Sequence, residues 1–159
     1  MNFLFLCTGN SCRSILSEAV FNYLAPAGLH AISAGSQPIG RLNPGAVAQL
    51  RRHGIGVEGY ASKSWHDLPF TPDVVVTVCG NAAGETCPAY LGNVVRTHWG
   101  LEDPGEVQGS PEQVEAAFEH TYQIVLARTR ALLALPLAEL SADRAALKLA
   151  LDRIGTLTP

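Results

Sequence analysis

Positive charge, long apolar runs and metal-type cysteine pairs are all scarce in this sequence, and each shortage excludes a class of protein. The 159 residues carry 11 Lys and Arg against 14 Asp and Glu, a formal net charge of -3. Such a balance offers no general attraction to nucleic acid or to an anionic membrane. No apolar stretch approaches the roughly 20 residues that cross a bilayer, and the first, NFLFL at residues 2–6, has no basic region before it. We therefore expect a soluble cytoplasmic protein with neither a membrane span nor a signal peptide.

The four cysteines lack the spacing of a metal site. No C-x2-C pair is present, which disfavours a four-cysteine zinc site, and the histidines are scattered along the chain. The cytosol is reducing, so thiols there serve redox chemistry more often than a static disulfide framework. Cysteines that only pack as small apolar side chains are the plainer alternative. We predict no bound metal.

Short runs rich in β-branched and aromatic residues alternate with segments of helical character. Strands are expected at residues 2–6, 30–35, 73–78 and 93–97. Helices are expected at residues 14–25 after a Ser14 cap, 44–53 between Asn43 and Gly54, 111–134 after the box SPEQ, and 141–154. The alternation predicts an α/β fold, a small doubly wound sheet of about four parallel strands flanked by helices. Residues 1–134 would form this domain, and residues 135–159 would add a C-terminal helical extension packed on it.

The segment CTGNSCRS, residues 7–14, lies between the first strand and the first helix, at the edge of the sheet where α/β proteins bind ligands. Its small residues let successive backbone N–H groups form an anion-binding nest, to which the helix adds its positive end. An arginine fork at the end of the loop matches two oxygens of a tetrahedral oxyanion. The expected binding residues are Thr8, Gly9, Asn10, Ser11, Cys12, Arg13 and Ser14.

Cys7 stands at the lip of this nest. A thiol beside an arginine and a helix N-terminus has a pKa of about 4–7, which makes it mostly thiolate and a nucleophile at neutral pH. The Lys-Ser/Thr ending of a nucleotide-binding P-loop is missing, so ATP or GTP is not expected. The structural alternative is a buried Cys7 with Arg13 in a surface ion pair. We interpret Cys12 as a packing residue of the loop or as an adventitious disulfide partner of Cys7, not as a relay thiol.

CTGNSCRS followed by SEA resembles the active-site loop of the low-molecular-weight protein tyrosine phosphatase superfamily. The resemblance covers roughly residues 1–134, and includes SAG at 33–35 and Asp-Pro at 103–104. It implies a phosphatase-like fold, with Asp103 as the general acid that protonates a departing oxygen. By residue chemistry alone, Asp-Pro-Gly would also start a turn well, and Glu102 is the nearest rival as the acid.

Two further cysteines point away from a phosphatase. Cys79 directly follows the strand 73–78 and should reach the same rim as Cys7, and Cys87 lies eight positions on. The small residues between them have little to bury, so the sequence predicts local opening at low cost. With the segment HWG…DP, this triple resembles the thioredoxin-coupled arsenate reductases. The resemblance implies a Cys7–Cys79 disulfide, then a Cys79–Cys87 disulfide, then reduction by thioredoxin, with no bound cofactor.

The resemblance also suggests a cation site near the loop. Some alternatives for the electron donor and the function stay open. Some arsenate reductases of this type bind potassium near the loop through Asn, Glu and a later acidic residue. Asn10, Glu18 and Ser33 match part of that pattern, but Lys63 stands where the acidic ligand is expected, so we predict no potassium. A glutaredoxin-like donor could replace thioredoxin. The other open function classes are a phosphatase and a non-catalytic oxyanion or redox sensor.

Overall fold

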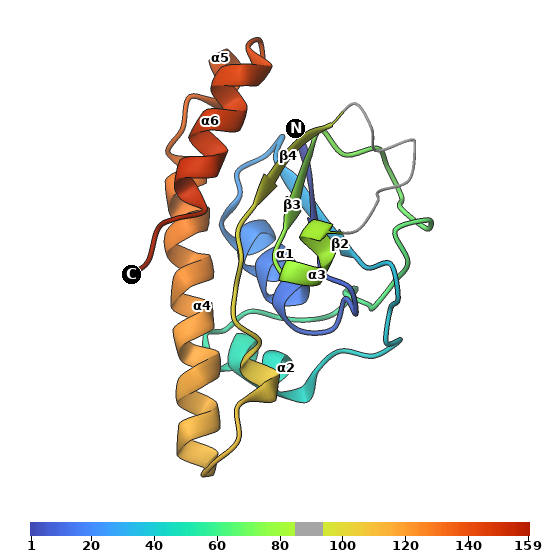
Figure 1. Ribbon diagram of the computed structural model, residues 1–159, viewed down its shortest axis with the longest axis vertical. Helices are drawn as coiled ribbons and strands as arrows, with labels where there is room; N and C mark the ends of the chain where they lie inside the picture. Colours follow the sequence, from blue (N-terminus) through green and yellow to red (C-terminus); the bar gives the residue numbers. More distant parts are fainter. Residues whose placement is uncertain (85–93) are drawn as a thin grey trace.

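The architecture is a four-stranded parallel sheet flanked by helices (Figure 1). The structure, a computed structural model, describes residues 1–84 and 94–159. The sheet has the order β2-β1-β3-β4, with β1 (Asn2–Leu6), β2 (His30–Ala34), β3 (Val74–Thr77) and β4 (Val95–His98). Nearly every residue of the central strands β1 and β3 is buried, as expected for apolar runs covered on both faces. The predicted fold class is confirmed.

The helices surround this sheet. They are α1 (Arg13–Leu24), α2 (Pro44–Arg52), α3 (Gly80–Gly84), α4 (Pro111–Leu133), α5 (Leu137–Leu140) and α6 (Arg144–Ile154), with a 3-10 turn, η2, at Pro104–Glu106. Helix α1 packs on β1, β2 and α4, while α6 packs on β4 and beside α4 (Figure 1). None of the described helices has both the length and the apolarity to cross a bilayer.

Two of the four predicted helix starts follow the prediction. Asn43 accepts hydrogen bonds from the first turn of α2, and Ser110 and Gln113 form the predicted capping box of α4. The predicted Ser14 cap is wrong, because α1 begins at Arg13 and Cys12 occupies the N-cap without a side-chain bond. Helix α6 begins later than predicted, after an Asp143 cap, because residues 137–140 form α5.

Candidate active site

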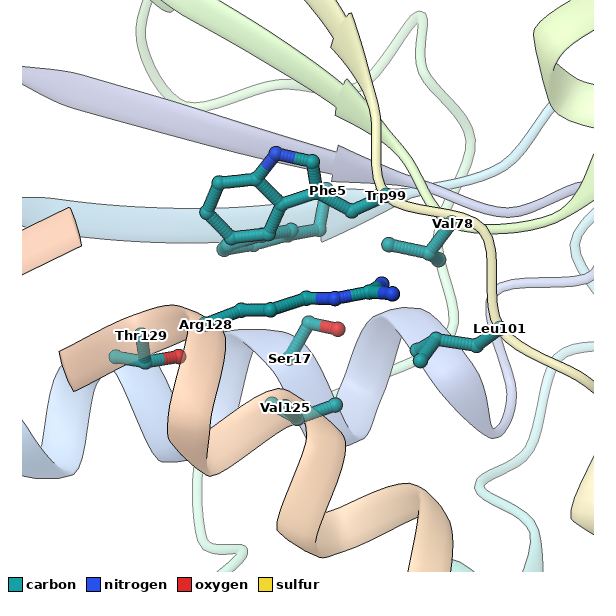
Figure 2. A pocket seen from close by; sticks show the side chains of 8 residues that line it. All are labelled: Phe5, Ser17, Val78, Trp99, Leu101, Val125, Arg128 and Thr129. Carbon is teal, nitrogen blue, oxygen red and sulfur yellow. The ribbon is translucent and has the colours of Figure 1, made fainter. Parts of the chain in front are cut away.

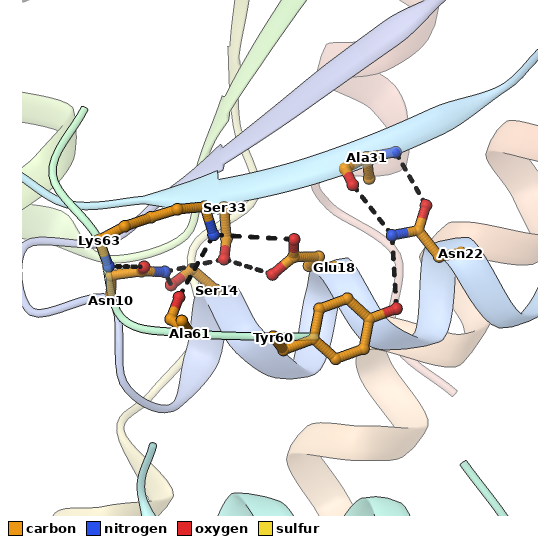
Figure 3. A network of polar contacts seen from close by, with 9 residues as sticks. All are labelled: Asn10, Ser14, Glu18, Asn22, Ala31, Ser33, Tyr60, Ala61 and Lys63. Atoms are coloured by element: carbon orange, nitrogen blue, oxygen red, sulfur yellow. Dashed lines mark hydrogen bonds and ion pairs between the residues drawn. The ribbon is translucent and has the colours of Figure 1, made fainter. Parts of the chain in front are cut away.

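The loop after β1 is held by one buried asparagine. Asn10 adopts a left-handed backbone conformation, φ 44°, which asparagine tolerates better than most residues. Its amide nitrogen donates to Ser14 Oγ at 2.9 Å and to Ser33 Oγ at 2.8 Å, and its oxygen accepts from the Lys63 backbone N–H at 2.9 Å (Figure 3). The turn that shapes the loop is therefore fixed from α1, from β2 and from the segment around residue 63.

Backbone N–H groups of the segment 37–43 donate hydrogen bonds to carbonyl oxygens of the loop. The backbone N–H groups of Gln37, Ile39 and Asn43 donate to the carbonyls of Thr8, Gly9 and Ser11 at 2.9–3.0 Å. The Gly9 N–H, in contrast, is directed at the Cys7 sulfur. The loop thus turns three of its carbonyls to its neighbour and directs one backbone donor, the Gly9 N–H, at the nucleophile, an arrangement that suits an anion nest.

Gly35 makes this approach possible, and residue-by-residue reasoning did not single it out. A Cβ atom at this position would lie 2.3 Å from the Thr8 carbonyl oxygen and 2.5 Å from that of Cys7. Only glycine lets β2 end so close to the loop. The sequence signal was the SAG at residues 33–35, whose serine bonds Asn10 and whose glycine provides the clearance.

Arg13 and Asp103 meet at this rim from distant parts of the sequence. Arg13 Nη2 lies 3.6 Å from Asp103 Oδ2, with the two side chains 19% and 27% exposed. Arg13 Nη1 donates to the Leu101 carbonyl at 3.0 Å, while its Nε is buried without a hydrogen-bond partner in the described part of the chain. Asp103 Oδ1 accepts from the Gly105 N–H at 2.9 Å. Asp103 therefore starts the turn η2 and still presents its other oxygen to the site.

The thiols of Cys7 and Cys79 lie side by side, close enough for each to shift the pKa of the other. They meet because β1 and β3 are neighbouring parallel strands, so that the residues after both strands reach the same edge. Cys79 also accepts from the Ala82 N–H at 3.4 Å, and its sulfur lies 3.8 Å from Thr8 Oγ1. Both thiols are buried. The predicted approach of the second thiol is thus present, whereas Cys87 lies outside the described residues.

The ionisation of this pair differs from the prediction. The hydrogen bond to Cys79 and burial raise the pKa of Cys7 above its ordinary value, against the lowering effect of Arg13 and the Gly9 N–H. The same hydrogen bond, with those from Thr8 and Ala82, lowers the pKa of Cys79 to about 5. The shared proton therefore favours Cys7, and the negative charge of the pair favours Cys79. The predicted lowering of the Cys7 pKa by Arg13 is present, but contact with Cys79 and burial oppose it.

Cys12 has the surroundings of a packing residue. It is buried at the start of α1, and burial together with the nearby Asp103 carboxylate raises the pKa of its thiol to about 12. A thiol with so high a pKa is a poor nucleophile at neutral pH.

The candidate cation position behind the loop holds a lysine (Figure 3). Ser33 donates to Glu18 Oε1 at 2.6 Å, and Lys63 Nζ lies 3.9 Å from Glu18 Oε2. Burial raises the pKa of Glu18, an effect that the Ser33 hydrogen bond and the Lys63 charge oppose. These residues do not suit a potassium ion, because the ammonium group of Lys63 already balances the carboxylate. Among the described residues no cluster of His, Cys, Asp and Glu could hold a metal.

Known proteins share both the sequence pattern and the fold. The family model for low molecular weight phosphotyrosine protein phosphatase matches residues 2–146. An arsenate reductase of Shouchella clausii is 38% identical over 127 residues, which is 79% of this chain and 90% of that protein. A solved arsenate reductase in its phosphate-binding state aligns with a TM-score of 0.66 at 27% identity, over 84% of this chain and 96% of the other. A thioredoxin-dependent arsenate reductase of Corynebacterium glutamicum shares the fold, with a TM-score of 0.58 at 24% identity over 82% of this chain and 59% of the other.

Proposed function

This chain belongs to the low molecular weight phosphotyrosine protein phosphatase family, and we propose that within it the chain is an arsenate reductase that converts arsenate to arsenite. The observation that carries the proposal is that the buried thiols of Cys7 and Cys79 meet at the same edge of the sheet, where the neighbouring parallel strands β1 and β3 end. A phosphatase of this family needs the loop, Arg13 and an acid, but it has no use for a second thiol against its nucleophile. A reductase does, because the two electrons that arsenic gains come from a pair of thiols that become a disulfide.

Arsenate binding uses the loop residues 8–14 and Arg13. The unpartnered Nε of Arg13 and the backbone donors of the loop are the groups that a tetrahedral oxyanion would satisfy. Arg13 already donates Nη1 to Leu101 and faces Asp103 with Nη2, so the guanidinium is held in one orientation before the anion arrives. Such preorganisation lowers the cost of binding.

The first chemical step forms a sulfur–arsenic bond. The Cys7 sulfur attacks arsenic, its proton passes to the hydrogen-bonded Cys79 thiolate, and an oxygen leaves arsenic as water after Asp103 donates a proton. The groups for both proton transfers already face the site: the Cys79 sulfur lies beside Cys7 and can accept its proton, and Asp103 lies beside Arg13 and can donate one. The product is a thioarsenate on Cys7 in which arsenic is still pentavalent.

The second step reduces arsenic. Cys79, having lost its proton again, attacks the Cys7 sulfur; a sulfur–sulfur bond forms and the sulfur–arsenic bond breaks. The electron pair of the broken bond stays on arsenic, which leaves as trivalent arsenite, while the two thiols are oxidised to a disulfide. Phosphorus does not undergo this step, which separates arsenate from phosphate although the nest binds both shapes.

Cys87 and a protein dithiol complete the proposed cycle. Cys87 would attack the Cys7–Cys79 disulfide to give Cys79–Cys87, which thioredoxin or a glutaredoxin-like donor then reduces by thiol–disulfide exchange. This part rests on the sequence resemblance. A reducing cytoplasm would suit the cycle, since the three described cysteines are free thiols. We also assign catalysis to residues 1–134 and a packing role to the extension 135–159.

One comparison tests the proposed function. Arsenite release is measured with thioredoxin, thioredoxin reductase and NADPH, beside hydrolysis of p-nitrophenyl phosphate, for the wild type and for Cys79→Ser. We expect Cys79→Ser to abolish arsenite release and to keep any phosphatase activity. Arsenite release by Cys79→Ser at the wild-type rate would refute the relay, and vigorous ester hydrolysis without arsenite release by the wild type would make the protein a phosphatase.

The place of Cys87 has its own test. If Cys87 acts last, Cys87→Ser should release one equivalent of arsenite per enzyme and then stop with a Cys7–Cys79 disulfide, which peptide mapping would identify. Sustained turnover with thioredoxin would show instead that the relay ends at Cys79.

A further inference from the structure

Arg128 is a buried cation that the proposed chemistry does not use. It lies on α4 with only 6% of its surface exposed, and within the described residues no carboxylate lies within ion-pair distance of it. Its side chain extends from α4 between Trp99 and Ser17, with the guanidinium toward Leu101 (Figure 2). Burial lowers the pKa of Arg128, which reflects the cost of holding a charge there. A charge retained at such a cost needs strong hydrogen-bond partners.

Those partners are two backbone carbonyls from separate parts of the chain. Arg128 Nη1 donates to the Gly100 carbonyl at 3.1 Å, and its Nε donates to the Leu157 carbonyl at 3.1 Å. Gly100 lies in the loop between β4 and Asp103, whereas Leu157 follows α6. One planar guanidinium thus joins the acid-bearing loop to the C-terminal segment, a geometry that an ammonium group cannot reproduce at both carbonyls.

Two further contacts bring the same two segments together. Trp99 donates its indole N–H to the Leu151 carbonyl on α6 at 2.9 Å. A Cβ atom at residue 155 would lie 2.6 Å from the His98 carbonyl oxygen and 2.9 Å from the Trp99 ring, so Gly155 is required for this close approach. The C-terminal segment is therefore fitted against residues 98–100.

From Gly100 the chain leads directly into the active site. Leu101 donates its N–H to Val78 at 3.0 Å and accepts from Arg13 Nη1 at 3.0 Å, and Asp103 then faces Arg13. The loop is thus held on one side by the catalytic arginine and on the other by Arg128. We propose that Arg128 is a positioning residue that, together with the C-terminal segment, fixes the placement of Asp103 for proton donation. This inference rests on the proposed role of Asp103.

The test is a double-mutant cycle between Arg128 and Asp103. The rate of arsenite formation in a single turnover is measured for Arg128→Lys, for Asp103→Asn and for the double variant, and phosphate inhibition is measured beside it. We expect Arg128→Lys to slow the turnover about tenfold while the phosphate inhibition constant stays within about twofold. In the Asp103→Asn background, Arg128→Lys should have little further effect on the rate, because residue 103 can then no longer donate a proton and its exact position no longer matters. Arg130→Lys, at an exposed position on the same helix, is the matched control and should behave as wild type.

A second perturbation removes the other carbonyl without touching Arg128. A chain that ends at Thr156 lacks the Leu157 acceptor, and a chain that ends at Thr158 keeps it. The first should reproduce the slow turnover and its dependence on Asp103, and the second should not, so the test stands even if Arg128→Lys fails to fold.

The outcomes distinguish a failure of the positioning role of Arg128 from a failure of the proposed reductase function. Equal losses from Arg128→Lys with and without Asp103, or a lowered melting temperature with an unchanged turnover rate, would overturn the positioning role and leave the reductase intact. An Asp103→Asn variant with the wild-type rate would remove the proposed acid and this inference with it.

Discussion

The Cys7–Cys79 hydrogen bond makes a quantitative prediction about which thiol ionises. The largest cause that lowers the pKa of Cys79 to about 5 is the hydrogen bond from Cys7. A hydrogen bond to a charged group contributes about 1.5–3 kcal/mol, and about 1.4 kcal/mol corresponds to one pKa unit. Cys7→Ala removes this donor and keeps those from Thr8 and Ala82, so the pKa of Cys79 should rise from about 5 to roughly 6–7.

The reciprocal variant, Cys79→Ala, should lower the pKa of Cys7. The bond to Cys79 is the largest cause that raises the pKa of Cys7, so Cys79→Ala should lower it and leave Arg13 and the Gly9 N–H to favour the thiolate. Ultraviolet absorbance of thiolates, followed through a pH titration of each single variant and of Cys12→Ala as a control, measures both changes. A Cys79 pKa that stays near 5 in Cys7→Ala would refute the reasoning, because the thiolate would then owe its stability to other groups.

Three further predictions concern the frame of the site. Arg13→Lys keeps the charge but loses the planar fork, so arsenate turnover should fall at least about tenfold; kinetics equal to wild type would remove Arg13 from the site. Gly35→Ala places a Cβ 2.3 Å from the Thr8 carbonyl oxygen, so the loop must shift. The melting temperature should fall and inhibition by phosphate should weaken; if neither changes, the loop does not need glycine at this position. Burial would raise the pKa of Glu119, but hydrogen bonds from His53, Gln123 and Gln49 outweigh it and lower this pKa to about 2. The stability that ionised Glu119 contributes is therefore present near neutral pH and is lost as the pH falls from about 4.5 toward about 2. Melting temperatures of wild type and Glu119→Gln should therefore converge in acid, and a constant difference would contradict this.

The sequence was sufficient for the sheet because its strands are continuous apolar runs with few other ways to be buried. The rim position of Cys7 and Cys79 also followed, since both residues come directly after strands. The cap of α1 could not be predicted as well, because Ser14 is a good capping residue that instead accepts a hydrogen bond from the buried Asn10. That bond depends on the left-handed turn at Asn10, which asparagine tolerates, and on the burial of its side chain between α1 and β2.

The ionisation of the thiol pair was out of reach for a different reason. It depends first on the contact between Cys7 and Cys79 and then on donors from Thr8 and Ala82, and the Ala82 donor reaches Cys79 because residues 80–84 form α3. The sequence GNAAG has two glycines and carries a weak helical signal. Local sequence therefore located both thiols, while their order of ionisation came from tertiary hydrogen bonds.

The two roles proposed for Cys79 impose an order on the reaction. Before the adduct forms, the lowered pKa of Cys79 favours its thiolate, which can accept the proton of Cys7 but has no electrophilic sulfur to attack. Once arsenic is bound to Cys7, that sulfur no longer donates a hydrogen bond, and the main cause of the low Cys79 pKa is gone. Cys79 must then release its proton before it can form the disulfide, with only the donors from Thr8 and Ala82 to favour the thiolate. The order of the two steps is therefore set by the adduct: the Cys7 sulfur becomes electrophilic only when it is bound to arsenic, so Cys79 cannot form the disulfide before arsenate has reacted.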